Sequence, residues 1–283
     1  MNVTRIARRD PRFPPLLAAI HDPPPALYLR GNADAGVLSG VGVAVVGARS
    51  CSSYGRAVGR MLARELAAAG VVVVSGMARG VDGVAHRGAL EASGVTVAVL
   101  GCGIDRDYPA AHAELARRIC QRGLVVSEYE PGVEPAPWRF PARNRIIAGL
   151  CRATVVVEAR ERSGALITAD FALEEGREVL AVPGEITSTL SAGTNALLRI
   201  GATPVTRAAD VLEALGIEPV ESSAPEIGEQ ARELLALLCD GSLTADELVR
   251  VAGADAARVS AALLELELAG CVVLEDGVYR ACN

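Results

Sequence analysis

Short valine-rich runs alternate with amphipathic segments from about residue 41 to residue 215, and this alternation restricts the fold more than any other feature of the chain. The runs are apolar at nearly every position, which is typical of strands buried on both faces. They predict strands at residues 43–46, 71–74, 95–100, 124–126, 154–157, 179–182 and 202–205. The helical segments between them include residues 54–69, 81–91, 110–121 and 165–175. The pattern therefore predicts an α/β domain in which helices cover both faces of a mostly parallel sheet.

The segments just past these predicted strands are rich in glycine, serine and arginine. They are residues 47–50, 75–80, 101–105, 162–165 and 183–185. In open parallel sheets, ligands bind beyond the carboxyl ends of the strands. Glycine lets the backbone approach a ligand closely, and consecutive N–H groups in such loops form concavities that bind anions. Because several such loops fall at the same edge of the sheet, a phosphate-rich ligand is favoured over ordinary strand–helix connections.

Residues 138–145, Trp-Arg-Phe-Pro-Ala-Arg-Asn-Arg, combine three arginines with two large aromatic residues, in a chain that has one Trp, three Phe and five Tyr. Aromatic rings beside guanidinium groups are typical of surfaces that bind single-stranded nucleic acid, because bases stack and phosphates pair there. The following residues read as a helix. Pro141 is therefore expected in its first turn and Arg143 beside outward-pointing N–H groups that favour an anion. The segment alone is equally compatible with a hydrophobic plug of Trp138 and Phe140 among solvated arginines.

The charge of the chain is unevenly distributed. The net charge is −6, which argues against a wholly basic nucleic-acid-binding protein. Residues 225–283 contain 11 acidic and 4 basic residues, whereas the remainder has 24 arginines against 23 acidic residues. All 28 basic residues are arginine, so any phosphate contact by a basic side chain must use the planar guanidinium group. The acidity therefore belongs to the C-terminal part of the chain.

The sequence gives little support to a membrane, metal or disulfide class. No apolar run approaches the roughly 20 residues that span a bilayer. The N-terminus lacks the apolar region of a signal peptide, so a cytoplasmic protein without membrane contact is expected. The seven cysteines include no CxxC pair and the three histidines no HExxH motif, so no metal site is expected. The cysteines are interpreted as small buried hydrophobic residues.

Composition divides the chain into four segments. Residues 1–40 form a proline-rich arm expected to lie across the domain, residues 41–216 the α/β domain, residues 217–227 a linker, and residues 228–283 an acidic domain. In the last segment, helices are predicted near residues 228–239, 244–252 and 255–269, and a hairpin at residues 271–274 and 278–280. Three helices and a hairpin make a winged helix. Its third helix has one arginine against three acidic residues, which disfavours duplex binding, so a protein-contact module or a vestige is expected.

Taken in order, these motifs resemble the DNA-processing protein A family (DprA, also called Smf). The resemblance rests on residues 13–17 (FPPLL), 20–24 (IHDPP), 27–32 (LYLRGN), 46–49 (VGAR), 75–82 (SGMARGVD), 85–90 (AHRGAL), 101–103 (GCG), 140–147 (FPARNRII), 163–168 (SGALIT) and 193–195 (GTN). Each motif alone is weak, but their ordered combination over residues 12–215 is highly specific.

The resemblance implies an extended Rossmann-like fold that binds single-stranded DNA and forms a homodimer. It also implies that the protein protects incoming strands during natural transformation and helps to load the recombinase RecA. The expected DNA-binding residues are Arg49, Ser50, Gly76, Arg79, Trp138, Arg139, Phe140, Arg143, Asn144, Arg145, Ser163, Gly164, Thr168, Gly193, Thr194 and Asn195. In this interpretation Arg49, Arg143 and Arg145 pair with phosphates. Trp138 or Phe140 stacks on bases, which favours single strands.

Two departures from the family pattern affect the expected contacts. Ala142 stands between Pro141 and Arg143, where relatives often have a lysine, so one DNA contact could be lost. Only about ten residues precede the proline-rich arm, whereas many relatives have a helical domain there. Partner or DNA contacts from such a domain are therefore not expected of this sequence.

Catalytic interpretations of the same segments are weaker. Asp82 and His86 lie four residues apart on one predicted helix, but this spacing more often gives a structural hydrogen bond or a cap than a catalytic pair. Asp105 and Asp107 could bind a metal, although capping of the next helix is the more common use. No set of nucleophile and base is found, so neither an enzyme nor a cofactor is expected.

The strongest rival is a nucleotide-processing enzyme of similar fold, of the phosphoribohydrolase kind. Such enzymes carry a Pro-Gly-Gly-x-Gly-Thr motif, whereas this chain has Pro-Gly-Glu at residues 183–185 and Gly-Thr at residues 193–194, without the glycine cluster. A dinucleotide-dependent oxidoreductase would need GxGxxG after the first strand, and residues 47–52 do not provide it.

Overall fold

The computed structural model of the protein describes residues 3–218, 227–239, 241–275 and 277–281. The chain divides into two compact units, Met1–Pro219 and Val220–Asn283, and each has its own hydrophobic core. Most of the predicted linker, residues 219–226, lies outside the described residues.

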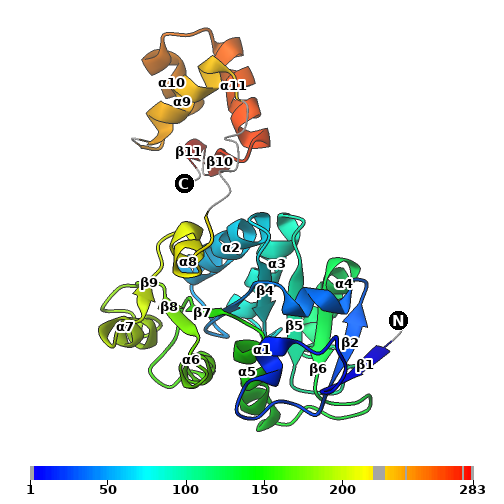
Figure 1. Cartoon of the computed structure of the whole chain (residues 1–283). Helices are drawn as coiled ribbons and strands as arrows, with labels where there is room; N and C mark the ends of the chain where they lie inside the picture. The colour runs from blue at the N-terminus through cyan, green and yellow to red at the C-terminus, as the bar shows by residue number, and fades with distance from the viewer. Residues whose placement is uncertain (1–2, 219–226, 240, 276, 282–283) are drawn as a thin grey trace. The chain divides into compact units, whose positions relative to one another are not determined.

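A single mixed sheet organises the N-terminal unit (Figure 1). Within the described residues it has nine strands in the order β1-β2-β6-β5-β4-β3-β7-β8-β9. The strands are β1 (Val3–Ala7), β2 (Ala26–Gly31), β3 (Gly42–Val46), β4 (Val72–Ser75), β5 (Thr96–Leu100), β6 (Leu124–Ser127), β7 (Ala153–Val156), β8 (Glu178–Ala181) and β9 (Thr203–Pro204). Strands β3 to β9 are mutually parallel. The strands predicted from the valine-rich runs are thus confirmed, as is the parallel sheet.

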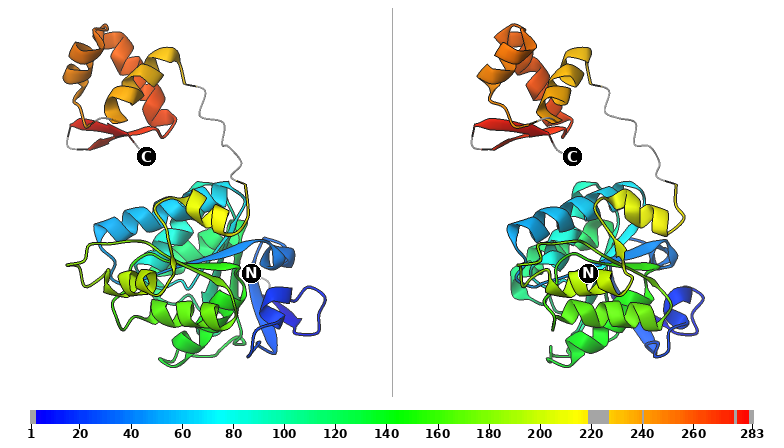
Figure 2. Two further views of the ribbon diagram at one scale, coloured as in Figure 1. Left: turned by 60° about the vertical axis from the view of Figure 1, so that its left-hand side comes forward. Right: turned by 90° about the vertical axis from the view of Figure 1, so that its left-hand side faces the viewer.

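Helices cover both faces of this sheet, as the views in Figure 2 show. They are α1 (Pro15–Ala18), η1 (Ala35–Ser39), α2 (Ser53–Ala68), α3 (Val81–Glu91), η2 (Ala110–His112), α4 (Ala113–Arg122), α5 (Arg139–Gly149), α6 (Gly164–Glu174), α7 (Ala192–Arg199) and α8 (Ala208–Ala214). Successive side chains of a strand point to opposite faces. In β3, Val43 and Val45 accordingly pack with α2, α3 and α8, whereas Ala44 and Val46 pack with α5, α6 and α7.

The N-terminal segment corrects one expectation. Residues 1–40 were expected to form an arm lying across the domain, but β1 and β2 extend the sheet as antiparallel strands beside β6. The side chains of Leu27 and Leu29 in β2 are buried together with Ile6 of β1. This alternating pattern is short and is flanked by prolines in the sequence, and the burial of β2 depends on contacts with other strands and helices.

The C-terminal unit has the expected winged-helix elements among its described residues. They are α9 (Glu229–Cys239), α10 (Ala245–Ala252), α11 (Ala256–Leu268) and the antiparallel strands β10 (Val272–Glu275) and β11 (Val278–Ala281). Thr244 and Glu247 form a reciprocal capping box that begins α10, and Gly253 ends this helix with a left-handed φ of 60°. The predicted turn residue Asp276 lies outside the described residues. In the described part of the chain, no helix is long and apolar enough to cross a membrane.

Candidate nucleic-acid interface

A pocket of about 430 Å³ opens where β3 and β7 end and where α5 and α6 begin. This is the volume range of ordinary small-ligand sites, and the place is the sheet edge at which parallel α/β folds bind ligands. Eight of the sequence-predicted DNA-binding residues line it: Arg49, Ser50, Phe140, Arg143, Asn144, Ser163, Gly164 and Thr168. We call it the arginine pocket, because Arg160 and Arg162 also line it.

The loop that follows β3 forms one wall of the arginine pocket and is anchored by Glu158. The buried Glu158 carboxylate accepts a hydrogen bond from the backbone N–H of Ser52 at 2.9 Å and another from its hydroxyl at 2.5 Å. The Ser52 hydroxyl oxygen in turn accepts from the N–H of Gly55 at 3.0 Å, which starts α2. The Glu158 carbonyl accepts from the N–H of Ala48 at 2.7 Å. Arg49, between these anchors, therefore projects from a fixed backbone.

The arginines that carry charge at the mouth of the pocket are Arg49, Arg160 and Arg162. All three side chains are exposed, and none has an ion pair with any residue that the structure describes. The Arg49 guanidinium carbon lies 5.7 Å from the centroid of the Phe140 ring, over its face. Arg160 and Arg162 were absent from the predicted site residues. The available signal was their place in the Arg-Glu-Arg-Ser-Gly loop after β7.

The N-terminus of α6 forms the opposite wall. Ser163 caps the helix, since its hydroxyl oxygen accepts from the N–H of Ala165 at 3.3 Å. The side-chain amide of Asn144 donates to the carbonyl of Gly164 at 3.0 Å and so fixes α6 against α5. A side chain at Gly164 would meet no atom within 4 Å, which shows that this turn faces open space. A helix N-terminus with exposed N–H groups favours an anion.

Arg143 has a different role from the one expected. Its side chain is buried, and the guanidinium donates to the carbonyl of Gly76 at 2.7 Å and to the carbonyl of Val99. Burial lowers the pKa of Arg143 to about 10, while the carboxylate of Asp82 opposes this shift. Burial also raises the pKa of Asp82, against the influence of Arg143. Arg143 thus ties the ends of β4 and β5 together beneath the pocket instead of extending beside outward-pointing N–H groups. Pro141, as expected, lies in the first turn of α5.

Gly76 belongs to the same arrangement. A β-carbon there would lie 2.7 Å from the Arg143 guanidinium and 2.7 Å from the Asp82 carboxylate. Only glycine leaves room for both groups at this point. Gly76, one of the expected DNA-binding residues, does not line the arginine pocket, and glycine is required here for packing beneath it.

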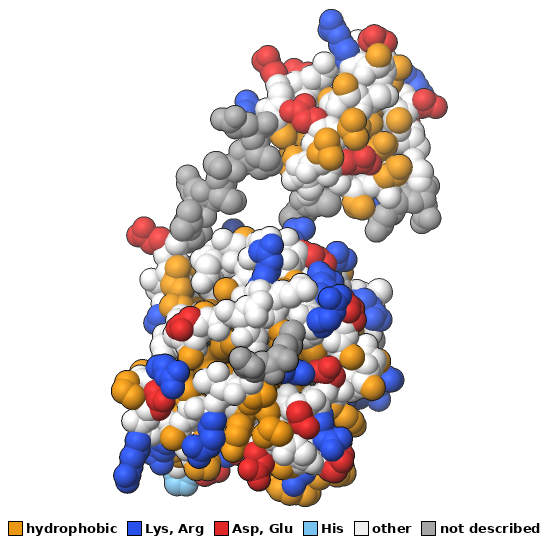
Figure 3. All heavy atoms as spheres, turned by 90° about the vertical axis from the view of Figure 1, so that its right-hand side faces the viewer, with side chains coloured by type: hydrophobic (Ala, Val, Ile, Leu, Met, Phe, Trp, Pro, Cys, Tyr) orange, Lys and Arg blue, Asp and Glu red, His pale blue; other side chains and the backbone are white. Residues whose placement is uncertain are grey.

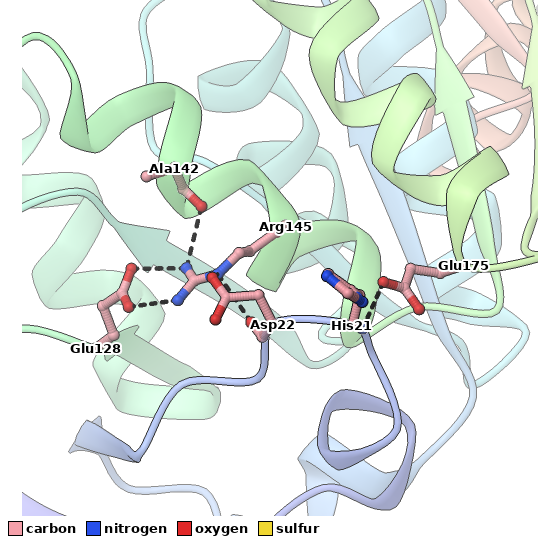
Figure 4. A network of polar contacts seen from close by, with 6 residues as sticks. All are labelled: His21, Asp22, Glu128, Ala142, Arg145 and Glu175. Carbon is pink, nitrogen blue, oxygen red and sulfur yellow. Dashed lines mark hydrogen bonds and ion pairs between the residues drawn. The ribbon is translucent and has the colours of Figure 1, made fainter.

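Arg145 is also engaged within the protein (Figure 4). It forms a bidentate pair with Glu128 at 2.8 and 2.7 Å and a third contact with the Asp22 carboxylate at 2.9 Å. Its side chain is 13% exposed, and it does not line the arginine pocket. Nearby, the backbone N–H of His21 donates to the carboxylate of Glu175 at 2.8 Å. These contacts hold the N-terminal segment against α5 and α6, which leaves Arg145 little capacity for a phosphate.

The Gly-Thr-Asn motif lies at the start of α7 and contacts the loops after β7 and β8. The Asn195 amide exchanges two hydrogen bonds with the backbone of Gly184, at 3.1 and 3.3 Å, and Thr194 is buried. A β-carbon on Gly193 would lie 2.7 Å from the carbonyl oxygen of Arg160. This motif therefore positions the loop that bears Arg160 without lining the arginine pocket itself.

The remaining predicted residues lie outside the pocket. Arg79 is exposed after β4 and is not among the lining residues. Trp138, immediately before α5, is 62% exposed. The guanidinium carbon of Arg139 lies 4.8 Å from the Trp138 ring centroid and 5.0 Å from that of Tyr129. The alternative of a buried hydrophobic plug is thus contradicted for Trp138, while Phe140 is half-buried.

The two residues of the catalytic alternative have different hydrogen-bond partners. His86 is fully buried, and its Nδ1 lies 2.7 Å from the Thr96 hydroxyl, whereas Asp82 accepts from the N–H of Ala78 at 3.1 Å. Burial lowers the pKa of His86 to about 3.

Asp105 and Asp107 neither cap the next helix nor contribute to a metal cluster. Asp105 accepts from the N–H of Gly132 at 2.9 Å, and Asp107 pairs with Arg30 at 2.5 Å. Among the described residues, no group of three or more His, Cys, Asp or Glu side chains could hold a metal ion. The carboxylates of Asp105 and Asp107 therefore stabilise contacts between this loop and neighbouring segments.

Both units of the chain match known protein families. Residues 4–216 match the family described as DNA recombination-mediator protein A, and residues 218–277 match the DprA winged helix domain. The chain is 47% identical over 207 residues to the DNA processing protein DprA of Streptococcus pneumoniae, covering 72% of this chain and 71% of that protein. It is 42% identical over 287 residues to protein Smf of Escherichia coli, covering 96% and 76%.

Solved structures show the same relationship. That of DprA from Streptococcus pneumoniae has a TM-score of 0.72 at 44% identity and covers 75% of this chain and 74% of that one. That of DNA processing protein A from Helicobacter pylori, described for its single-stranded DNA binding mode, has a TM-score of 0.68 at 30% identity and covers 76% and 96%. The extended Rossmann-like fold and the winged helix agree with these matches, and the chain belongs to the DNA recombination-mediator protein A family.

Proposed function

We propose that the arginine pocket and the surface around it bind single-stranded DNA, and that the protein handles such strands by binding rather than by catalysis. One observation carries the proposal: Arg49, Arg160 and Arg162 converge with the N-terminus of α6 on one pocket at the carboxyl edge of the sheet. The Helicobacter pylori relative, described as binding single-stranded DNA, supports the choice of ligand.

The three exposed arginines and the first turn of α6 supply the phosphate contacts. Guanidinium groups bind phosphate in a planar, bidentate manner, and the helix N-terminus adds backbone N–H donors. The buried guanidinium of Arg143 lies beneath them beside the carboxylate of Asp82. The sequence analysis assigned phosphate contacts to Arg143 and Arg145, whereas this proposal assigns them to Arg160 and Arg162. Preference for single strands follows because stacking on an exposed aromatic ring such as that of Trp138 requires unpaired bases.

Fluorescence anisotropy tests this proposal with a labelled poly-dT oligonucleotide and a duplex of equal length. Three to five neutralised phosphates would give a slope of log K against log salt of roughly −2 to −3.5. Arg160→Ala and Arg162→Ala are each expected to weaken binding and to flatten this slope by about 0.7. Arg118→Ala is the matched control, because Arg118 is an exposed arginine of α4 outside the pocket. Equal affinity for duplex, or a slope unchanged in both variants, would refute the proposal. Turnover of nucleoside monophosphates would instead favour the enzyme alternative.

We further propose that the homodimer implied by the family forms through α6 and α7. A groove of about 490 Å³ between these helices is lined by Leu166, Ile167 and other apolar residues, and Ile200 at its edge is 76% exposed. Helix α6 is apolar on nearly all sides, as expected of a helix that is covered. Arg162 lines both this groove and the arginine pocket, so a second copy here would bring two DNA sites close together.

Sedimentation analysis tests the dimer. Ile200→Glu places a charge in the groove and is expected to shift the protein to monomer and to lower its avidity for long oligonucleotides. Arg199→Glu, one residue away on the exposed end of α7, is the charge-reversal control. A dimer that persists in Ile200→Glu would place the interface elsewhere.

The winged helix is proposed to contact protein, and RecA is the partner that the family resemblance implies. Helix α11 carries Arg258 against Glu265 and Glu267, a balance that disfavours a duplex. Figure 3 shows apolar side chains gathered with acidic ones on one face of this unit. Leu268 of α11 is 80% exposed. Pull-down of purified RecA by the whole protein, with and without Leu268→Lys, tests this contact.

A further inference from the structure

Aromatic residues are scarce in this chain, yet several of them gather around the start of α5. The chain has one Trp, three Phe and five Tyr, and Tyr108, Tyr129, Trp138 and Phe140 all take part in ring contacts there. Tyr108 comes from the loop after β5, a segment that the sequence did not single out for its aromatic residue. Its ring stacks on Phe140 with centroids 5.2 Å apart and planes inclined by 26°.

We propose that Tyr108 is a DNA-binding residue, and that a base of the strand leaving the arginine pocket stacks on the face of its ring that Phe140 does not cover. The inference rests on the proposed function and adds a stacking position beyond the pocket. It concerns unpaired bases of any sequence, because every base presents a π-face.

The surroundings of Phe140 direct the base to Tyr108. A β-carbon at Gly101 would lie 2.9 Å from the Phe140 ring, so this ring packs closely on the backbone at the end of β5. The Arg49 guanidinium lies over the same ring, and Tyr108 stacks on it. Phe140 is therefore largely enclosed by its own neighbours. It serves as the support of a stack whose accessible member is Tyr108.

Tyr108 has the exposure and the order that a stacking position requires. Tyr108 is 44% exposed, and its hydroxyl forms no hydrogen bond with any described residue. Since the ring is already held in a stack on Phe140, little side-chain freedom is lost when a base stacks on it. A single exposed aromatic residue is ordinary on a protein surface. Tyr108 differs because it stacks on Phe140, which lines the arginine pocket. This contact places Tyr108 beside the site.

The test is anisotropy on the whole protein with Tyr108→Ala, Tyr108→Leu and Tyr108→Phe. Loss of the ring is expected to weaken binding of poly-dT by about 5- to 140-fold, the range that alanine substitution gives for base–aromatic stacking. Tyr108→Phe should bind as the wild type does, because the hydroxyl has no role. The slope against salt should stay unchanged in all three variants, since no cation is removed.

An oligonucleotide of abasic sites separates stacking from a structural role. If Tyr108 stacks on a base, Tyr108→Ala and the wild type should bind the abasic strand equally. If Tyr108 merely supports Phe140 and Arg49, the variant would also lose affinity for the abasic strand and its salt slope would flatten, which would overturn the inference. Arg162→Ala is measured in parallel. Weaker binding by Arg162→Ala but not by Tyr108→Ala refutes only the role of Tyr108, whereas no binding of poly-dT by the wild type refutes the proposed function.

Discussion

Replacement of Arg143 by alanine distinguishes a structural arginine from a phosphate clamp. Its buried guanidinium donates to the carbonyls of Gly76 and Val99 beside the buried Asp82. A hydrogen bond from a charged donor contributes about 1.5 kcal/mol or more to stability, so loss of both lowers the free energy of unfolding by about 3 kcal/mol. In a domain of this size that corresponds to a decrease in Tm of roughly 6–12 °C.

Urea unfolding followed by circular dichroism measures this loss, with Arg162→Ala as the control. Because Arg162 is exposed and has no ion pair with any described residue, its removal should change the free energy of unfolding by no more than about 0.5 kcal/mol. The two variants should therefore behave oppositely: Arg143→Ala loses stability, and Arg162→Ala loses DNA affinity at unchanged stability. A stable Arg143→Ala protein that no longer binds DNA would refute this reasoning and restore Arg143 as a phosphate contact.

Three further predictions concern the buried groups around the site. Burial lowers the pKa of His86 from 6.5 to about 3, so the unfolded chain binds a proton that the folded one does not. The free energy of unfolding should fall by up to about 1.4 kcal/mol per pH unit as the pH drops below 6.5. Urea unfolding between pH 7 and 5 should show a smaller dependence of this free energy on pH for His86→Gln than for the wild type, and an unchanged dependence for His21→Gln. Glu158→Gln should cost about 1–2 kcal/mol in thermal unfolding and weaken poly-dT binding, because the loop after β3 loses an anchor; unchanged affinity would contradict this. Gly76→Ala should cost about 1–3 kcal/mol through overpacking, whereas Gly164→Ala, with open space around it, should unfold as the wild type does.

The sequence predicted the sheet, its helices and the edge at which the site lies. Strands buried on both faces favour continuous apolar runs, and loops that approach an anion favour glycine and serine. Both features can therefore be recognised from short segments of the sequence. The helix start near Pro141 is local in the same sense. The first strands escaped prediction because the burial of Leu27 and Leu29 depends on β6, a segment distant in sequence.

The roles of the individual arginines were decided only by the tertiary structure. Sequence motifs placed Arg143 and Arg145 at the site, but whether a guanidinium reaches solvent depends on which carbonyls and carboxylates other elements bring to it. Arg143 donates hydrogen bonds to the carbonyls of Gly76 and Val99, and Arg145 pairs with the carboxylate of Glu128. These three partners belong to three different strands or the loops that follow them. Arg160 and Arg162 stay available because both side chains are exposed and neither forms an ion pair with any described residue. Local periodicity thus determined at which edge of the sheet the candidate site lies, whereas long-range packing determined which arginine side chains remain exposed there.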